Sequence, residues 1–459
     1  MRHKKEVAAK PAAIRGVRAR RRRVPSMVVV LVAVAVAMTA WTSGASASSS
    51  SRASRSGKSE LIIADLAPFS GVDAALGPIY LASCLGATKA INSAGGVLGH
   101  TLGCKGFDTR GDPADAVPAT RQMFATTPNL VLVIGCTSDE AASVVPIINA
   151  QHMVMFCMTG QSEFDHVKFP YFFRLVPPDL AEAFALLAIA HNYEHFTRIA
   201  LAFGNDIGSQ TFVQPAIAGI HRAHLDLVAN ETLDLTASTF RTEADKILLA
   251  HPQVILSEAL GATAATFLSE LKQLNHGKMI PIVGTSASIS PAWYKSVAAA
   301  IGASTLTKYF LADNLVTETS GPAYKDFAKS MYAVRSQIPG GSGNFSTFLT
   351  APGAVHLYDG MNLAALAMVM SNSTTPSVYR PDILKIGDGV PGAVVVHSFA
   401  QGVAALKKHK AIRFIGPGGP TSFDAYHDSS GLFQIDRYST NGTVQVVANL
   451  PASELKAYS

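Results

Sequence analysis

Residues 133–161 read VIGCTSDEAASVVPIINAQHMVMFCMTGQ and carry the strongest evidence for a fold class. The apolar runs 130–135 and 153–158 have the length of buried strands, and the stretch between them is long enough for a helix. A strand, a helix and a strand at this spacing form a right-handed crossover between parallel neighbours. The segment therefore predicts an α/β protein with a parallel sheet.

The same alternation extends on both sides of this segment. From residue 60 strands and helices alternate as far as PYFFRLVPPD, and the rhythm then restarts and continues to MIPIVGTSA. Pro177 and Pro178 separate the two series and predict a hinge, because proline fixes its own backbone and favours an extended neighbour. We expect two doubly wound parallel-sheet lobes of one design. Residues 416–420, rich in glycine and proline, predict a sharp crossing, and the strands after it resemble a hairpin.

The charge of the chain gives no sign of a nucleic-acid partner. The 459 residues have a formal net charge of +6, but ten of the lysines and arginines precede residue 25. The rest is close to neutral and offers no basic surface for a polyanion. With 48% apolar and 15% charged residues, the composition is typical of a globular protein with a large core.

The N-terminal residues resemble a secretory signal. Basic residues precede the apolar run MVVVLVAVAVAMTAW, and an Ala45-x-Ala47 site follows it. This order predicts a signal peptide over 1–47 that is cleaved after Ala47, a flexible serine-rich tether over 48–59, and an extracytoplasmic protein. An uncleaved anchor is the alternative, although about 20 apolar residues are needed to span a membrane.

In an exported chain the four cysteines favour disulfides over thiol chemistry. Spacing alone does not fix the pairing, but the order of elements favours Cys84 with Cys104 and Cys136 with Cys157. The fourteen histidines are scattered and form no zinc-binding pattern. We therefore expect no metal and no cofactor.

Two polar clusters mark the candidate site. Thr137, Ser138, Asp139 and Glu140 follow one predicted strand and have the pattern of a capping box. The second cluster, 158–161, follows the next strand. Because the carboxyl ends of parallel strands meet at one edge of a sheet, hydroxyls and amides from both clusters converge there, which suits a carboxylate. A helix cap with no ligand is the alternative for the first cluster.

The sequence lacks the patterns of catalytic sites. Ser138 is not in a G-x-S-x-G elbow, and no histidine follows at an expected strand end. His152 is interpreted as a helix-end or core residue. No phosphate loop of the form G-x4-G-K-[ST] occurs. We expect a protein that binds its ligand without reacting with it. Core packing is favoured over a place in the cleft for Phe69, Phe164 and Trp293.

Together, several motifs resemble the leucine/isoleucine/valine-binding family of type I periplasmic solute-binding proteins, which supply ABC importers. The resemblance spans about residues 60–450. The matching motifs are LAPFSG, INSAGGVLGH, FDTRGDPADAV, VIGCTSD, MTGQSEF, YFFRLVPPD, YDGMNLAALAM and FIGPGGPTSFDAYHDSSG.

The resemblance implies two lobes joined by three crossings, with a ligand held between them. The implied ranges are 60–177 plus about 310–415 for lobe 1, and 178–309 plus about 416–459 for lobe 2. It implies a monomer that delivers a small amino acid-like, amide or carboxylate ligand to the permease of an ABC importer. A ligand-sensing subunit of the same fold is the alternative, and a hydrolase is a third, less favoured reading. The ligand-binding residues implied by the family and by the polar clusters are Thr137, Ser138, Met158, Thr159, Gly160, Asp206, Ile207 and Ser286.

The chain departs from the family pattern at two of these positions. Ile207 replaces the aromatic residue that usually follows the aspartate of the second lobe, and Ser286 stands closest to the acidic residue that receives a ligand ammonium. Burying an ammonium without a carboxylate costs several kcal/mol, so an ordinary α-amino acid is not favoured. Asp206 or Glu258 could supply the carboxylate, but a solvated rim or a helix cap is an equal interpretation for both.

Overall fold

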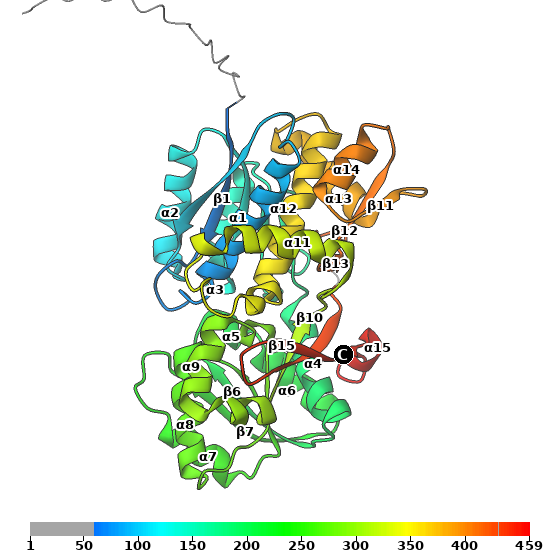
Figure 1. The fold of residues 1–459 in the computed structure, drawn as a ribbon. Helices are drawn as coiled ribbons and strands as arrows, with labels where there is room; N and C mark the ends of the chain where they lie inside the picture. The colour runs from blue at the N-terminus through cyan, green and yellow to red at the C-terminus, as the bar shows by residue number, and fades with distance from the viewer. Residues whose placement is uncertain (1–58, 430) are drawn as a thin grey trace, which may run out of the picture. The chain divides into compact units, whose positions relative to one another are not determined.

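Each lobe of the protein is a sheet covered by helices on both faces (Figure 1). The computed structural model describes residues 59–429 and 431–459, which belong to one compact unit. The predicted signal peptide lies outside this range, as does the predicted tether except for Ser59. Among the described residues, no helix is both long and apolar enough to cross a membrane.

The first sheet has five parallel strands in the order β2-β1-β3-β4-β5. The alternation of strand and helix predicted from the sequence is confirmed. The strands are β1 (Leu61–Ala67), β2 (Leu102–Asp108), β3 (Leu130–Gly135), β4 (Met155–Cys157) and β5 (Phe172–Arg174). The connecting elements are α1 (Gly77–Ser93), α2 (Pro113–Thr126), α3 (Ser138–Ala150) and the short turn η1 (Ser162–Phe164).

Strand β3 shows why the sheet is buried on both faces. Val133 packs with the residues of α2 and α3, whereas Leu132 and Ile134 pack on the opposite face with α1 and a later helix, α12 (Pro352–Met370). Successive side chains of a strand point to opposite faces, so an apolar run without alternation needs a cover on each side.

The second sheet has seven strands in the order β15-β14-β10-β9-β8-β6-β7. Its parallel strands are β6 (Arg198–Gly204), β7 (Asp226–Leu233), β8 (Val254–Glu258), β9 (Ile282–Gly284) and β10 (Phe310–Leu315). The predicted C-terminal hairpin is confirmed as β14 (Phe433–Tyr438) and β15 (Val444–Leu450), which extend this sheet with antiparallel pairing.

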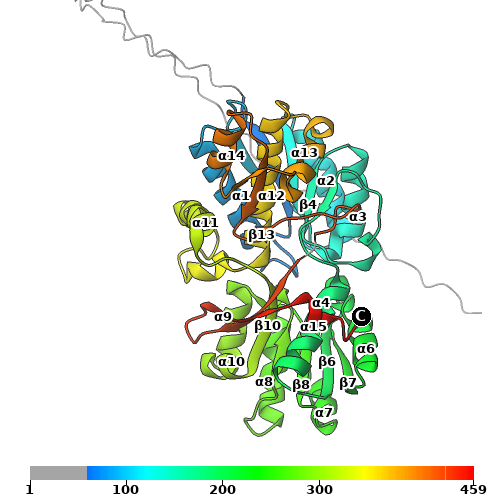
Figure 2. The same cartoon turned by 90° about the vertical axis from the view of Figure 1, so that its right-hand side faces the viewer.

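The helices of the second lobe divide between two cores, one on each face of the sheet. One face carries α4 (Asp179–Ala188), which continues as the π-helical turn η2 (Ile189–Tyr193), with α6 (Val213–Arg222) and α15 (Ala452–Leu455). Figure 2 shows α15 beside α4. The remaining elements are α5 (Ile207–Gln210), α7 (Arg241–Leu249), α8 (Gly261–Leu274), η3 (Ser286–Ser288), α9 (Pro291–Ile301) and α10 (Ala303–Tyr309).

Residues 321–420 return to the first lobe, where α11 and α12 pack against α1 (Figure 1). A small third sheet has the order β11-β12-β13. The segment contains α11 (Gly321–Val334), η4 (Arg335–Gln337), η5 (Phe345–Leu349), α12, α13 (Pro376–Asp388), β11 (Val394–Val396), α14 (Phe399–Leu406), β12 (Ile412–Gly416) and β13 (Gly419–Pro420).

The sheet assignments refine two expectations about where the chain changes lobe. Strand β10 lies at the start of the range expected for lobe 1, yet it pairs with β9 and β14 of the second sheet. Residues 416–420 do not form the crossing that their composition predicted, because Gly416 pairs with Gly419 in a tight hairpin. We propose that lobe 1 comprises about 60–175 and 320–424, and lobe 2 about 179–316 and 431–459.

Three crossings therefore connect the lobes, and they are hydrogen-bonded to one another. The backbone N–H of Arg174 donates to the carbonyl of His427 at 3.0 Å, which joins the first and third crossings. The N–H of Val316 donates to the carbonyl of Leu432 at 2.9 Å, which joins the second and third. The hinge is thus a small set of paired segments rather than three independent linkers.

The scattered histidines have a structural explanation. Eight of them have positive φ, and six of these directly follow helix ends: His152, His195, His224, His251, His276 and His409. Helices commonly end in a left-handed residue, usually glycine, and histidine adopts this conformation more readily than most other side chains. The interpretation of His152 as a helix-end residue is confirmed, and its ring stacks on Tyr171.

We expect His224→Gly to raise the free energy of unfolding by about 1 kcal/mol, because φ is +54° at this exposed position and a Cβ is strained there. His221→Gly is the matched control. His221 is an exposed residue in the last turn of α6, so glycine there lowers stability by about 0.3–0.5 kcal/mol. Urea denaturation of both variants measures the difference. Equal effects at the two positions would contradict the capping role.

Candidate ligand-binding cleft

A cavity of about 160 Å³ lies between the two lobes. Lobe 1 contributes the loop after β1, the residues after β3 and β4, and the N-terminus of α12. Lobe 2 contributes the start of α4, the residues after β6 and β8, and the segment that follows β9. The cavity is therefore built largely from the carboxyl ends of strands, where ligands bind in open α/β sheets.

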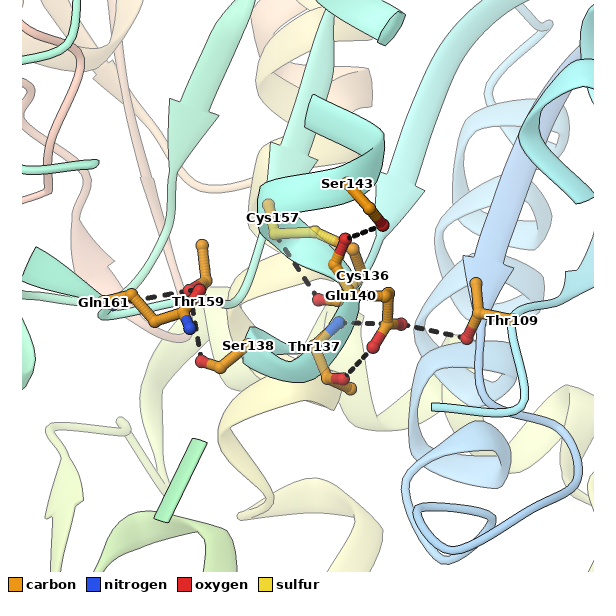
Figure 3. Close-up of a disulfide and its surroundings, with 9 residues drawn as sticks. All are labelled: Thr109, Cys136, Thr137, Ser138, Glu140, Ser143, Cys157, Thr159 and Gln161. Atoms are coloured by element: carbon orange, nitrogen blue, oxygen red, sulfur yellow. Dashed lines mark hydrogen bonds between the residues drawn. A yellow bond between two sulfur atoms is a disulfide. The ribbon is translucent and has the colours of Figure 1, made fainter. Parts of the chain in front are cut away.

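The end of β3 is shaped by two consecutive left-handed residues. Gly135 has φ +100° and Cys136 has φ +56°, and after this bend Thr137 caps α3. The predicted capping box is confirmed (Figure 3). The N–H of Thr137 donates to Oε1 of Glu140 at 3.1 Å, and the Thr137 hydroxyl donates to Oε2. The hydroxyl of Thr109 also donates to Oε1, at 2.9 Å, so this carboxylate is well satisfied.

The second polar cluster meets the first. The hydroxyl oxygens of Ser138 and Thr159 lie 3.1 Å apart and their side chains point toward one another (Figure 3), and Thr159 donates to Oε1 of Gln161 at 3.1 Å. Immediately before the two clusters, a disulfide joins Cys136 to Cys157. Sequence order had favoured this pairing and Cys84 with Cys104, and both are confirmed.

Six of the eight predicted ligand-binding residues line the cavity: Thr137, Ser138, Met158, Gly160, Asp206 and Ser286. Thr159 is fully buried behind Ser138 and contributes no lining surface. Ile207 is 48% exposed and also does not line it. Core packing was favoured for three aromatic residues: Phe69 and Phe164 pack in the cores of lobe 1, and Trp293 packs in a core of lobe 2 and is also part of the cavity wall.

Two acidic residues of lobe 2 that the sequence left open between ligand contact and cap line the cavity. Asp206 is the N-cap of α5 and accepts from the N–H of Ser209 at 2.8 Å, while its Oδ2 is buried without a hydrogen-bond partner. Glu258 ends β8 and accepts hydrogen bonds from the hydroxyl of Thr285 and, at 3.4 Å, from that of Ser209. Asp206 is thus both a helix cap and a wall residue.

Four further acidic residues line the cavity and were not among the predicted ligand-binding residues, although Asp139 belongs to the first polar cluster: Asp73, Asp139, Asp179 and Glu182. Asp139 and Asp179 lie in the first turns of α3 and α4, where an acidic side chain is ordinarily explained by the helix dipole. The sequence offered one indication that Asp139 and Asp179 face the cavity: each lies at the start of a helix that follows a strand, and strand ends form the edge where ligands bind.

The lobes also form hydrogen bonds with each other away from the hinge. The N–H of Gly208 in lobe 2 donates to Oδ1 of Asp139 in lobe 1 at 2.7 Å. The segment before α12 contacts the turn between β14 and β15, where the Thr347 hydroxyl donates to the carbonyl of Gly442 at 3.0 Å and Nδ2 of Asn344 to that of Asn441 at 2.8 Å. The structure is therefore a closed arrangement of the cleft.

Burial of so many carboxyl groups raises their pKa values. Burial, and next the neighbouring Asp139, raise the pKa of Asp73 to about 9. Burial raises the pKa of Asp179 to about 7 against the opposing effect of the Thr211 hydroxyl. Burial, and next Asp206, raise the pKa of Glu258 well above its usual value. Protons therefore remain on cleft carboxyls at pH values where an exposed acid is ionised.

We expect the free energy of unfolding to fall as the pH rises from 7 to 8.5. Asp73 keeps its proton in the folded state up to about pH 9, whereas the unfolded chain loses it near the ordinary pKa of 3.8. The folded state then binds more protons than the unfolded state, and linkage makes stability decrease with pH, by about 1.4 kcal/mol per unit for each such proton. Denaturant titrations at several pH values measure this slope.

Asp73→Asn is the control variant. An amide does not titrate in this range, so the free energy of unfolding of this variant should fall less steeply with pH than that of the unmodified protein. The range above pH 7 also avoids His356, whose pKa burial lowers to about 4 and which changes stability in the opposite sense below its ordinary pKa of 6.5. Stability that does not fall between pH 7 and 8.5 would contradict the raised pKa of Asp73, because a carboxyl that is ionised in both states contributes no pH dependence.

Comparison with known proteins identifies the family. The model of the Periplasmic binding protein family matches residues 61–424. The chain belongs to the Periplasmic binding protein family. The resemblance seen in the sequence is confirmed, and membership places the protein among binding proteins rather than enzymes, with an extracytoplasmic location. A search of curated protein sequences gave no significant match.

Solved structures of Periplasmic binding proteins share the fold. The leucine binding protein LivK of Thermotoga maritima superposes with a TM-score of 0.67 at 15% identity over 86% of this chain and 99% of that one. LivJ of Streptococcus pneumoniae, in complex with isoleucine, gives 0.66 at 16% identity over 85% and 99%. A solute binding protein of R. palustris, in complex with benzoate, gives 0.64 at 16% identity over 85% and 96%. The predicted two-lobe α/β class is confirmed.

The described part of this Periplasmic binding protein has one group of three side chains close enough to share a metal ion: Asp65, Cys84 and Cys104. The two cysteines are joined to each other in a disulfide, so they provide no thiolate ligands. This group does not fit a metal site.

Proposed function

We propose that the protein captures a small polar solute between its lobes outside the cytoplasm and delivers it to an ABC importer. The observation that carries the proposal is the cavity, whose walls combine polar and apolar residues from both lobes. The fold supports it, because the neighbours with a leucine, isoleucine or benzoate description have the same two-lobe architecture.

The mechanism follows from contacts that exist only when the lobes meet. A solute that touches Ser138 of lobe 1 and Asp206 of lobe 2 at once gains its second set of contacts in the closed form alone, so its binding shifts the population toward closure. The hydrogen bond between Asp139 and Gly208 adds to the stability of that form. The hinge segments, paired with one another, allow the rotation while keeping the lobes in register.

Thermal-shift screening of the exported protein against a metabolite library tests the proposal. A solute present at 100 times its dissociation constant stabilises the folded state by about 2.7 kcal/mol, which gives a clear rise in melting temperature. X-ray scattering of each hit should show a smaller radius of gyration with solute than without it. If no solute stabilises the protein or contracts it, the proposed function is wrong.

Ser138→Ala tests the site itself. We expect it to weaken each hit, while Ser143→Ala does not. Ser143 lies on the same helix and donates to the carbonyl of Glu140, but it does not line the cavity. An unchanged affinity in the Ser138 variant would place the solute elsewhere.

A further inference from the structure

The charged side chains that line the cleft are all acidic. Its lining includes six carboxyl side chains, whereas no lysine, arginine or histidine of residues 59–429 or 431–459 is part of it. Lobe 1 supplies two of the six and lobe 2 supplies four. The residues are Asp73, Asp139, Asp179, Glu182, Asp206 and Glu258.

At the hinge the chain neutralises two acids with its own cation. Arg174 is fully buried at the hinge and forms ion pairs with Asp165 at 2.6 Å and Asp428 at 3.0 Å. The cleft contains no such partner among the described residues. Its counter-charge must come either from protons or from the solute, since isolated buried carboxylates are too costly to remain ionised.

The wall residue Asp206 has one carboxylate oxygen that receives no hydrogen-bond donor from the protein. Oδ2 of Asp206 is buried and has no hydrogen-bond partner, although Oδ1 accepts from Ser209. An unsatisfied buried acceptor costs about 1–3 kcal/mol, and more when it is charged, so a donating group placed against it is strongly favoured. A cationic N–H donor also satisfies the charge.

The position that would receive an anion is already occupied. The N-terminus of α3 has its own carboxylate in Glu140, which accepts from the N–H and hydroxyl of Thr137. Ser138, beside it, shares a hydrogen bond with Thr159, and the next side chain is Asp139. A solute carboxylate would enter beside acidic groups with no positive side chain to balance it, which opposes binding by like-charge repulsion and desolvation.

The carboxyls are too widely spread to hold a metal ion. In the described part of the chain, no three of the cleft acids bring ligand atoms within the distance that one ion requires. The spread suits a molecule that carries separated N–H donors on a carbon skeleton. The apolar part of the wall, which includes Ile79, Tyr80, Phe212 and Trp293, gives that skeleton a surface to pack on.

We propose that the solute is a small organic cation, with ammonium or guanidinium groups held by carboxylates of both lobes and with no carboxylate required for recognition. This inference rests on the proposed function and names the solute class of the same cleft. The lobe 1 pair, Asp73 and Asp139, binds one side of the molecule. Asp206 and Glu258, from lobe 2, bind the other.

A series of probes with similar skeletons and different charge tests the solute class. The probes are 1,4-diaminobutane, 1-aminobutane, butanamide, butanoate and L-isoleucine, measured by thermal shift and titration calorimetry on the exported protein. We expect the diamine to bind most tightly and the monoamine more weakly, with no binding of the amide or the butanoate. Binding of the diamine should release protons, seen as a heat that changes with the ionisation enthalpy of the buffer.

Variants locate the interaction. Asp206→Asn should weaken diamine binding by at least tenfold and Glu258→Gln similarly, whereas Asp245→Asn, an exposed acid of α7 outside the cleft, should leave it unchanged. Melting temperatures without solute establish that each variant is folded. Asp139→Asn tests the contribution of lobe 1. It should also weaken diamine binding, and its amide oxygen can still accept the hydrogen bond from the N–H of Gly208.

The outcomes separate this inference from the proposed function. Stabilisation and contraction by butanoate, butanamide or isoleucine, without any response to the amines, would overturn the cationic class and leave the solute-binding function standing. Diamine binding that is unchanged in the Asp206 and Glu258 variants would also overturn it. A protein that responds to none of these probes and to no member of the metabolite library would overturn both.

Discussion

Replacing Arg174 with methionine lowers the free energy of unfolding by about 3–5 kcal/mol at pH 7.5, the largest single-residue effect that we expect. Methionine fills part of the volume but leaves Asp165 and Asp428 without their cation, and removing one partner of a buried ion pair is strongly destabilising. The Arg174 side chain also donates to the carbonyl of Gln161 at 2.9 Å, so that oxygen loses its donor as well.

The loss should be smaller at acidic pH. Burial raises the pKa of Asp428 to about 6 even with Arg174 beside it, and removal of the arginine raises it further. A carboxyl with a raised pKa in the folded state contributes stability that is present at low pH and lost as the pH rises through that pKa. Denaturation at pH 5 and at pH 7.5 measures the difference, and Arg241→Met on the exposed start of α7 is the control. An equal loss at both pH values would contradict this account.

Removing the Cys136–Cys157 disulfide by a double alanine substitution lowers the free energy of unfolding by about 3 kcal/mol. The two cysteines are 21 residues apart, and the cost corresponds to the chain entropy that a loop of this length regains in the unfolded state. The alanine that replaces Cys136 would also have to hold φ near +56° without the covalent constraint, so residues 136–161 should loosen locally.

The Cys84–Cys104 disulfide is a matched control, because its cysteines are 20 residues apart and the expected entropic cost is nearly the same. The two double variants should therefore lose similar stability. Hydrogen exchange distinguishes the two variants, because only the one without the Cys136–Cys157 disulfide should exchange faster at residues 136–161. A binding measurement also distinguishes them, because only this variant should bind solute more weakly. Equal exchange in that segment would show that the disulfide does not organise the cleft.

Local pattern predicted most of the elements, because strand, helix and cap signals lie within a few residues of one another. The capping box from Thr137 to Glu140 is such a case. Which sheet a strand joins is not a local property. The run that forms β10 is fully buried and could be buried in either lobe, and only its pairing with β9 and β14 places it in the second sheet.

The sequence predicted only those cleft residues whose position follows from a local pattern. Ser138 and Gly160 follow strands, and strand ends meet by rule. Asp73 and Asp179 face the cavity because loops distant in sequence fold toward it, and their acidic character alone resembles that of any helix N-terminus or turn. The contact between Asp139 and Gly208 joins residues 69 apart in sequence and depends on the relative position of two lobes, which no local pattern contains.

The route of the chain between the lobes has a consequence for biogenesis. The first lobe lacks α11 and α12 until residue 370 has been synthesised, and the second lobe lacks β14 and β15 until residue 450 has been synthesised. Both lobes are therefore incomplete at the same time during synthesis. During that interval the edge of β10 that later pairs with β14 is open, and an open strand edge can associate with other chains. A secretion route that withholds the chain from compaction until its carboxyl end is free would suit this topology, and truncation before residue 433 should yield aggregates rather than a soluble single lobe.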